Sequence, residues 1–138
     1  MTRYITLAEY FWLAEQVTAT EAAVLVKAAR VELADSALHA PAAGFGDQDF
    51  YPDVIDKAAV LTCRLAWNHP LPDGNKRAAW ASLVMFLDLN NVTWDPNPPN
   101  VDDAEAAMLA VAAREVDEAW FADWLRERVR VADDADRE

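Results

Sequence analysis

Hydrophobic residues recur along most of the chain at the three-to-four-residue spacing of amphipathic helices. Between Asp53 and Asn68 they share one helical face: Val54, Ile55, Ala58, Leu61, Leu65 and Ala66. From Asn75 to Leu89 the chain is apolar on nearly every face, which is typical of a helix at the centre of a bundle. The pattern predicts an amphipathic helix, a short loop and then a central buried helix.

Helix-start signals extend this pattern to both ends of the chain. Thr6-Leu-Ala-Glu9 forms a capping box that opens a helix through Val17. Further helices are expected at 21–30, 31–38, 102–113 and 116–131. The segment 41–49 contains glycines and 95–100 contains three prolines, so both are expected to be irregular. Residues 1–132 are thus predicted to form one all-α domain, a compact bundle of about six helices around a central helix at about 75–90, followed by a frayed tail at 133–138.

Two features of the apolar positions favour packing over chemistry. Trp120, Phe121, Trp124 and Leu125 recur at helical spacing, and core packing is favoured over an interaction surface. Cys63, the single cysteine, lies on an apolar helical face. It is expected to be a small core residue and not a nucleophile, and it leaves no partner for a disulfide within the chain.

Composition narrows the classes of function. The chain has 138 residues and a formal charge of −12, which argues against a nucleic-acid partner because affinity for phosphate backbones comes from clustered lysine and arginine. No stretch of eighteen apolar residues occurs, and no basic segment followed by an apolar one opens the chain. We therefore expect a cytoplasmic protein without a membrane span or signal peptide.

The stretch His69 to Trp80, HPLPDGNKRAAW, carries the candidate chemistry. Pro70 and Pro72 disfavour helix in the residue before each, so His69 and Leu71 are expected to be extended, in a stiff loop. At Asp73-Gly74-Asn75 the next helix begins, and its free backbone N–H groups and dipole make an anion site. Lys76 and Arg77 add two positive charges.

Phosphoryl or nucleotidyl transfer needs positioning, a divalent cation, charge stabilisation and a proton acceptor. Asp73 is the only acid in the loop and the natural ligand for Mg²⁺. Imidazole accepts protons readily near neutral pH, which makes His69 the candidate base. From the residues alone, an ordinary interhelical turn capped by Asp73, with Lys76 and Arg77 in solvent, is about equally supported.

A family resemblance separates these two interpretations. His69-Pro-Leu-Pro-Asp-Gly-Asn-Lys-Arg resembles the signature His-x-Phe-x-Asp-x-Asn-Lys-Arg of the Doc (death on curing) branch of the Fic superfamily. Further similar stretches are LADSAL at 33–38, AGFG at 43–46, FYP at 50–52, KAA at 57–59 and FLDLNN at 86–91. The resemblance implies the helical Fic/Doc fold, in which the loop at about 41–50 is a flap that pairs with a target's extended backbone.

The resemblance also implies roles for the loop residues. His69 would deprotonate the target hydroxyl, and Asp73 would hold the magnesium that bridges nucleotide phosphates. Asn75 and Gly74 would form the anion hole, and Arg77 would bind phosphate. Leu71 replaces the family's usual phenylalanine, and both side chains can anchor the loop in the core.

Lys76 is where this sequence departs from adenylylating Fic proteins, which have glycine there and a second arginine where this chain has Trp80. Doc proteins share the lysine, and the resemblance implies that ATP lies reversed and offers its γ-phosphate. The implied activity is a kinase that modifies a Thr or Ser of a translation protein, with elongation factor Tu named by the family. The alternatives are AMP transfer and a catalytically inactive Fic-like binding module.

The implied partner is an antitoxin of the prevent-host-death (Phd) type, whose C-terminal segment folds into a groove on the toxin. Many Fic proteins inhibit themselves through a Ser/Thr-x-x-x-Glu helix. No Ser or Thr of this chain is followed by glutamate four residues on, so inhibition from outside is expected.

Overall fold

The computed structural model describes residues 1–132, which form seven α-helices, one short 3-10 helix and two pairs of short antiparallel strands. The first half contains α1 (Leu7–Thr18), α2 (Ala22–Ala28), α3 (Val31–His39), η1 (Ala40–Ala42), β1 (Gly44–Phe45), β2 (Gln48–Asp49) and α4 (Val54–Asn68). The second half contains α5 (Asn75–Leu89), β3 (Val92–Trp94), α6 (Val101–Ala112), α7 (Glu118–Arg126) and β4 (Val129–Val131). The predicted all-α bundle is confirmed, with seven α-helices within residues 1–132 where about six were expected.

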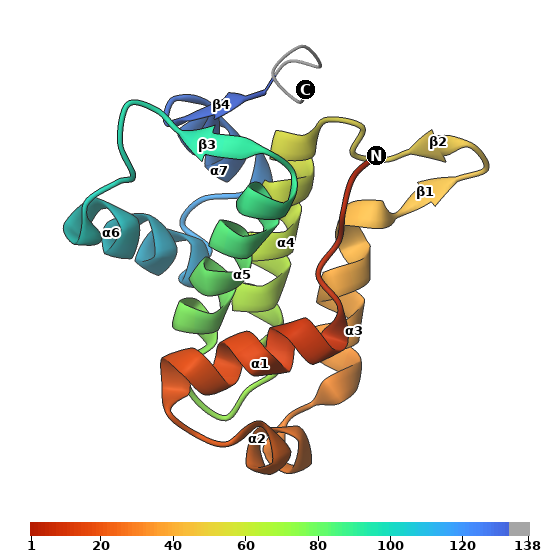
Figure 1. Ribbon diagram of the computed structural model, residues 1–138, viewed down its shortest axis with the longest axis vertical. Helices are drawn as coiled ribbons and strands as arrows, with labels where there is room; N and C mark the ends of the chain where they lie inside the picture. The colour runs from red at the N-terminus through yellow and green to blue at the C-terminus, as the bar shows by residue number, and fades with distance from the viewer. Residues whose placement is uncertain (133–138) are drawn as a thin grey trace.

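The centre of the bundle is the pair α4 and α5, which lie side by side and run in opposite directions (Figure 1). α4 packs against α5, α7, α3 and α6, and most of its residues are buried. α1 packs against α5. α5 is central as predicted, but Val84 on its outer face is 40% exposed. α4 is therefore the more deeply buried helix, and α5 keeps one face available.

The helix predicted at 116–131 is wrong in its second half. α7 ends at Arg126, and Val129–Val131 form strand β4, which pairs with β3 so that Thr93 lies opposite Arg130. Phe121, Trp124 and Leu125 are buried, which confirms the predicted core role, whereas Trp120 is 40% exposed. Apolar residues continue at helical spacing into the strand, so spacing alone predicted a helix that is too long.

The segment 41–49 is also more regular than expected. It contains the end of η1 and the hairpin β1–β2, in which Phe45 pairs with Gln48. Gly46 has φ +61, and a Cβ on Gly44 would collide with the Gln48 carbonyl across the hairpin. The glycines that suggested an irregular loop are therefore the residues that allow a tight hairpin.

Lys57, in the first turn of α4, fixes this hairpin to the bundle. Its side chain is 1% exposed, and Nζ donates to the Pro41 carbonyl at 3.0 Å and to Asp49 Oδ2 at 3.0 Å. The ammonium also lies 5.6 Å from the centre of the Tyr4 ring. Burial alone lowers the pKa of Lys57, but the bonds to Asp49 and Tyr4 outweigh it and raise that pKa. The charge is thus buried and fully partnered.

Cys63 is fully buried in the middle of α4, as predicted for a core residue. Burial, with the nearby Glu118 and Asp117 carboxylates, raises the pKa of its thiol to about 12, so the reactive thiolate does not form near neutral pH. Within residues 1–132 no helix is both long enough and apolar enough to cross a membrane. The tail expected at 133–138 lies outside the described residues.

Candidate active site

The loop between α4 and α5 begins with an unusual backbone conformation at His69. α4 ends at Asn68, and His69 follows with φ 48 and ψ 55, in the left-handed region. The extended conformation predicted for His69 is therefore wrong. Contacts with the rest of the fold have overridden the local preference of a residue before proline. The turn leaves the imidazole exposed while Pro70 behind it is buried.

Leu71 and Asn75 hold the loop closed. Leu71 is 4% exposed, which confirms that it anchors the loop in the core. The Leu71 N–H donates to Asn75 Oδ1 at 3.0 Å, and Asn75 Nδ2 donates to the Leu71 carbonyl at 2.9 Å. Asn75 Nδ2 also lies 3.5 Å from His69 Nδ1. The Asn75 carboxamide is thus occupied in shaping the loop, and its backbone N–H is what it can offer to an anion.

Gly74 starts α5 and packs closely against α1. It has φ 79 and ψ 18, and no side chain caps the helix. A Cβ added at Gly74 would come within 2.6 Å of Thr18 Cγ2 and 3.2 Å of Arg77 Nη2. The first N–H groups of α5 have no intrahelical acceptors, and no capping side chain accepts from them at this positive end of the helix dipole. This geometry suits an oxyanion.

The charged groups of the site are exposed and weakly engaged. Arg77 Nη1 donates to the Val17 carbonyl at 3.1 Å, and Arg77 Nη2 lies 3.7 Å from Asp73 Oδ2. The side chains of Arg77 and Asp73 are 59% and 94% exposed, so their ion pair contributes little and can be exchanged for a ligand. Within residues 1–132, Lys76 has no ion-pair partner. The structure therefore leaves both cations available to an anion.

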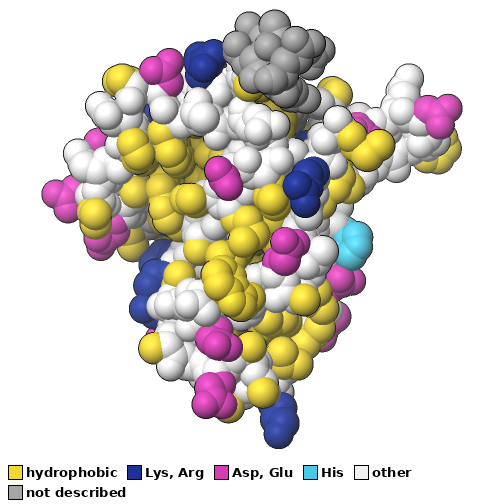
Figure 2. Space-filling model, viewed as in Figure 1, with side chains coloured by type: hydrophobic (Ala, Val, Ile, Leu, Met, Phe, Trp, Pro, Cys, Tyr) yellow, Lys and Arg dark blue, Asp and Glu magenta, His cyan; other side chains and the backbone are white. Residues whose placement is uncertain are grey.

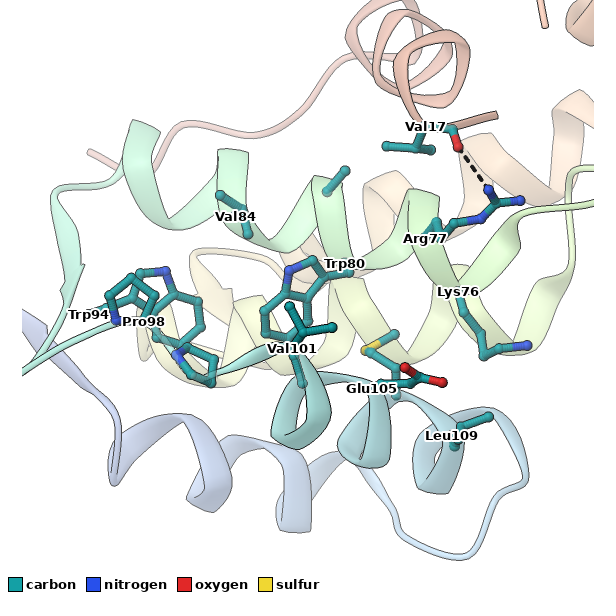
Figure 3. A pocket seen from close by; sticks show the side chains of 14 residues that line it. Val17, Lys76, Arg77, Trp80, Val84, Trp94, Pro98, Val101, Glu105 and Leu109 are labelled. Atoms are coloured by element: carbon teal, nitrogen blue, oxygen red, sulfur yellow. Dashed lines mark hydrogen bonds between the residues drawn. The ribbon is translucent and has the colours of Figure 1, made fainter. Parts of the chain in front are cut away.

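A groove of about 1050 Å³ opens from these cations along the outer face of α5. Lys76 and Arg77 stand at one end, α6 forms the opposite wall, and Trp94 and Pro98 lie at the other end (Figure 3). Pro99 also lines the groove. Figure 2 shows a small group of lysine and arginine side chains beside hydrophobic surface, close to the start of α5. A mostly apolar groove with a few charges at one end is typical of a small-molecule site.

Trp80 belongs to the wall of this groove. Its ring stacks on Trp94 with centroids 5.8 Å apart and 17° between the planes, and it meets Trp124 edge-on at 6.2 Å. Trp80 lies one helical turn beyond Lys76 on the same face of α5. The position that carries a second arginine in adenylylating Fic proteins is therefore filled here by an aromatic wall.

Sequence reasoning did not predict the groove, although two stripes of residues carry a signal for it. Positions 76, 80 and 84 of α5 and positions 101, 105 and 109 of α6 each recur every four residues, and all six line the groove. Val101 is 78% exposed and Leu109 49% exposed. Only the fold shows that the two stripes face each other, because corresponding positions of the two stripes are 25 residues apart and leave no local pattern.

The hairpin that resembles the family's flap lies at the opposite end of α4 from His69. Its base is held by Lys57 in the first turn of the helix, and His69 follows the last turn. The twelve residues from Lys57 to His69 correspond to about 18 Å along the helix. In Figure 1 the hairpin projects at the upper right, while the His69 loop lies low, near α1 and α2. A target-pairing role for the hairpin stays a prediction.

Residues 4–87 match the family model described as Fic/DOC family, which includes the whole loop and nearly all of α5. The chain belongs to the Fic/DOC family. It is 46% identical over 85 residues to a protein named Toxin Doc from Mycolicibacterium smegmatis, a match that covers 62% of this chain and 65% of that relative. The α6 wall of the groove lies beyond the family match.

Proposed function

We propose that this chain is a Doc-like toxin that transfers the γ-phosphate of ATP to a Ser or Thr hydroxyl of a translation protein, with elongation factor Tu as the candidate target. The observation that carries the proposal is the pair of available cations, Lys76 and Arg77, beside the uncapped start of α5 and next to an exposed histidine. The relative named Toxin Doc supports the toxin assignment.

In the proposed reaction the phosphates bind at the start of α5. Arg77 exchanges its weak contact with Asp73 for phosphate oxygens, which it can hold in a bidentate fork, and Lys76 adds a point charge. The backbone N–H groups of the first turn stabilise the charge that develops on the transferred phosphoryl group. The nucleoside has room in the groove beside Trp80.

His69 is the proposed base. Its exposed imidazole accepts the proton of the target hydroxyl as the hydroxyl oxygen bonds to the γ-phosphorus and the bond to the bridging oxygen of ADP breaks. Asn75, 3.5 Å from Nδ1, lies on the side of the ring away from Nε2 and so leaves Nε2 open to the target.

Asp73 fits the magnesium that ATP brings. No group of three or more His, Cys, Asp or Glu side chains that could hold a metal occurs within residues 1–132. One exposed carboxylate is nevertheless enough for Mg²⁺, which takes one or two carboxylates together with phosphate oxygens and waters. When bound, the ion would neutralise charge on the phosphates.

The test uses ATP labelled at the α or the γ position, Mg²⁺ and elongation factor Tu. We expect γ label on the factor, and about 10² to 10⁴ less of it with His69→Ala. Because His69 is exposed, that variant should unfold at the same urea concentration as the parent, which serves as the control. Transfer of α label would replace the kinase by an AMP transferase, and no transfer of either label would support a binding module.

We further propose an antitoxin partner of the Phd type and action in the cytoplasm. The name of the relative supports a toxin. No Ser or Thr of this sequence is followed by glutamate four residues on, which supports inhibition by a separate protein. Expression of the chain alone should arrest growth, and expression of His69→Ala should not. If both versions are harmless at equal protein levels, the toxin proposal is wrong.

A further inference from the structure

The backbone of His69 needs outside support. It has φ 48 and ψ 55, a conformation that is uncommon for a residue with a Cβ, and the next residue is a proline, which favours an extended predecessor. Such conformations persist where surrounding contacts determine them, and they cluster at functional sites. The contacts on either side of His69 therefore show what holds the candidate base in place.

Both contacts come from the start of α3, one from Arg30 just before the helix and one from Leu33 in its first turn. Before His69, Asn68 Nδ2 donates to the Leu33 carbonyl at 3.0 Å. After His69, the Pro70 carbonyl accepts from the Arg30 N–H at 2.8 Å. The chain is thus held immediately before and immediately after the histidine, while the imidazole itself stays exposed. Of the two contacts, only the first is made by a side chain, that of Asn68 at the end of α4.

We propose that Asn68 is a positioning residue, which together with Arg30 and Leu33 at the start of α3 braces the left-handed backbone of His69 and so aims the imidazole. The inference rests on the proposed function, because Asn68 acts through His69 as base. A side chain that served only to end α4 would affect stability alone. A side chain that aims His69 must affect the chemical step, and only while His69 is present.

Kinetics of γ-phosphate transfer with Asn68→Ala, His69→Ala and the double variant separate these two roles. A misplacement of about 1 Å can cost about 10²-fold in rate, so we expect kcat of Asn68→Ala to fall by about 10- to 10²-fold, with KM for ATP changed by less than about twofold. In the His69→Ala background the second substitution should cost no further rate, because the two residues act as a unit.

Asp117→Ala is the matched control. Asp117 Oδ1 accepts from the Trp120 N–H at 2.8 Å at the start of α7, so its removal also deletes one side-chain contact with the main chain. We expect it to lower the urea midpoint about as much as Asn68→Ala and to leave kcat unchanged. If the two variants lower kcat equally, or if Asn68→Ala costs the same rate with and without His69, the positioning role is wrong.

Hydrogen exchange tests the brace without any activity. The amides of Arg30 and Leu71 should exchange at least about tenfold faster in Asn68→Ala than in the parent, while amides of α7 keep their rates. Asn68→Asp is the second variant if Asn68→Ala does not fold. Its carboxylate has no hydrogen to donate to Leu33, so the same change is expected. Unchanged exchange at Arg30 and Leu71 would overturn the inference. A parent protein that transfers no phosphate would instead overturn the proposed function, and the exchange rates would still show whether Asn68 supports the backbone of His69.

Discussion

Two lysines, one in the first turn of α4 and one in the first turn of α5, differ in burial and in hydrogen-bond partners. At the first turn, Lys57 is buried, and its ammonium bonds to Pro41 and Asp49. Beyond the other end of α4, Lys76 lies in the first turn of α5, where it is exposed and has no ion-pair partner within residues 1–132. The ammonium of Lys57 is bound within the fold, whereas the ammonium of Lys76 is available to a ligand.

This difference shows how the site can be recognised. Polar groups that stabilise a fold are buried and satisfied, because an unpaired buried group costs free energy. The charges of the loop are exposed, and their one ion pair, between Asp73 and Arg77, is long at 3.7 Å. These charges contribute little to the stability of the fold, although Leu71 anchors the loop that carries them in the core. Such an arrangement is expected where a charged ligand binds.

Replacing each lysine by methionine is the strongest way to break the comparison. Lys57→Met leaves the Pro41 carbonyl without its donor and should lower the free energy of unfolding by about 1 to 3 kcal/mol. Lys76→Met should change it by less than about 0.5 kcal/mol. Urea unfolding of both variants measures this. Nucleotide affinity should respond in the reverse order, falling for Lys76→Met and not for folded Lys57→Met.

Equal losses of stability in the two methionine variants would contradict this assignment of roles. So would a loss of nucleotide affinity in Lys57→Met as large as that in Lys76→Met.

Gly74→Ala tests the close contact at the loop end. The substitution places a side chain at φ 79, which costs about 1 to 2 kcal/mol, and brings its Cβ against Thr18 Cγ2. Thr18→Ser in the same chain removes that methyl and keeps the hydroxyl, which donates to the Ala14 carbonyl at 2.7 Å. The double variant should therefore regain part of the lost stability in urea unfolding but not all of it. Full recovery would show that the left-handed backbone at Gly74 costs nothing.

Cys63, midway along α4, should have the smallest effect on stability, and this effect depends on pH. Its pKa is raised from 9.0 to about 12, so the folded state holds a proton that the unfolded state releases above pH 9. The corresponding stability is present below pH 9 and is lost as the pH rises toward 12. At pH 8 alkylation by iodoacetamide should be at least about tenfold slower in the folded protein than in urea. Equal rates would mean that the middle of α4 opens readily.

The helices were predictable where the apolar spacing of the sequence ends at a helix-breaking proline or glycine. The bounds of α4 and α5 follow from apolar spacing interrupted by Pro70, Pro72 and Gly74, and the capping box at Thr6 and Glu9 marks the start of α1. The site residues were predictable because they lie in one short segment.

What could not be predicted depends on contacts between distant parts of the chain. Strands β3 and β4 are three residues each, and their pairing joins segments about forty residues apart. The conformation of His69 depends on Arg30 and Leu33, which local preferences cannot include. The groove needs α5, α6 and the prolines at 98 and 99 together.

The stacked indoles of Trp80 and Trp94 give the groove an intrinsic optical signal. Both rings line the cavity, so any occupant changes their surroundings and with them their ultraviolet emission. Filling of the groove, by nucleotide or by a peptide, can therefore be followed in the unlabelled protein, and Trp80→Phe would identify which part of the signal arises there.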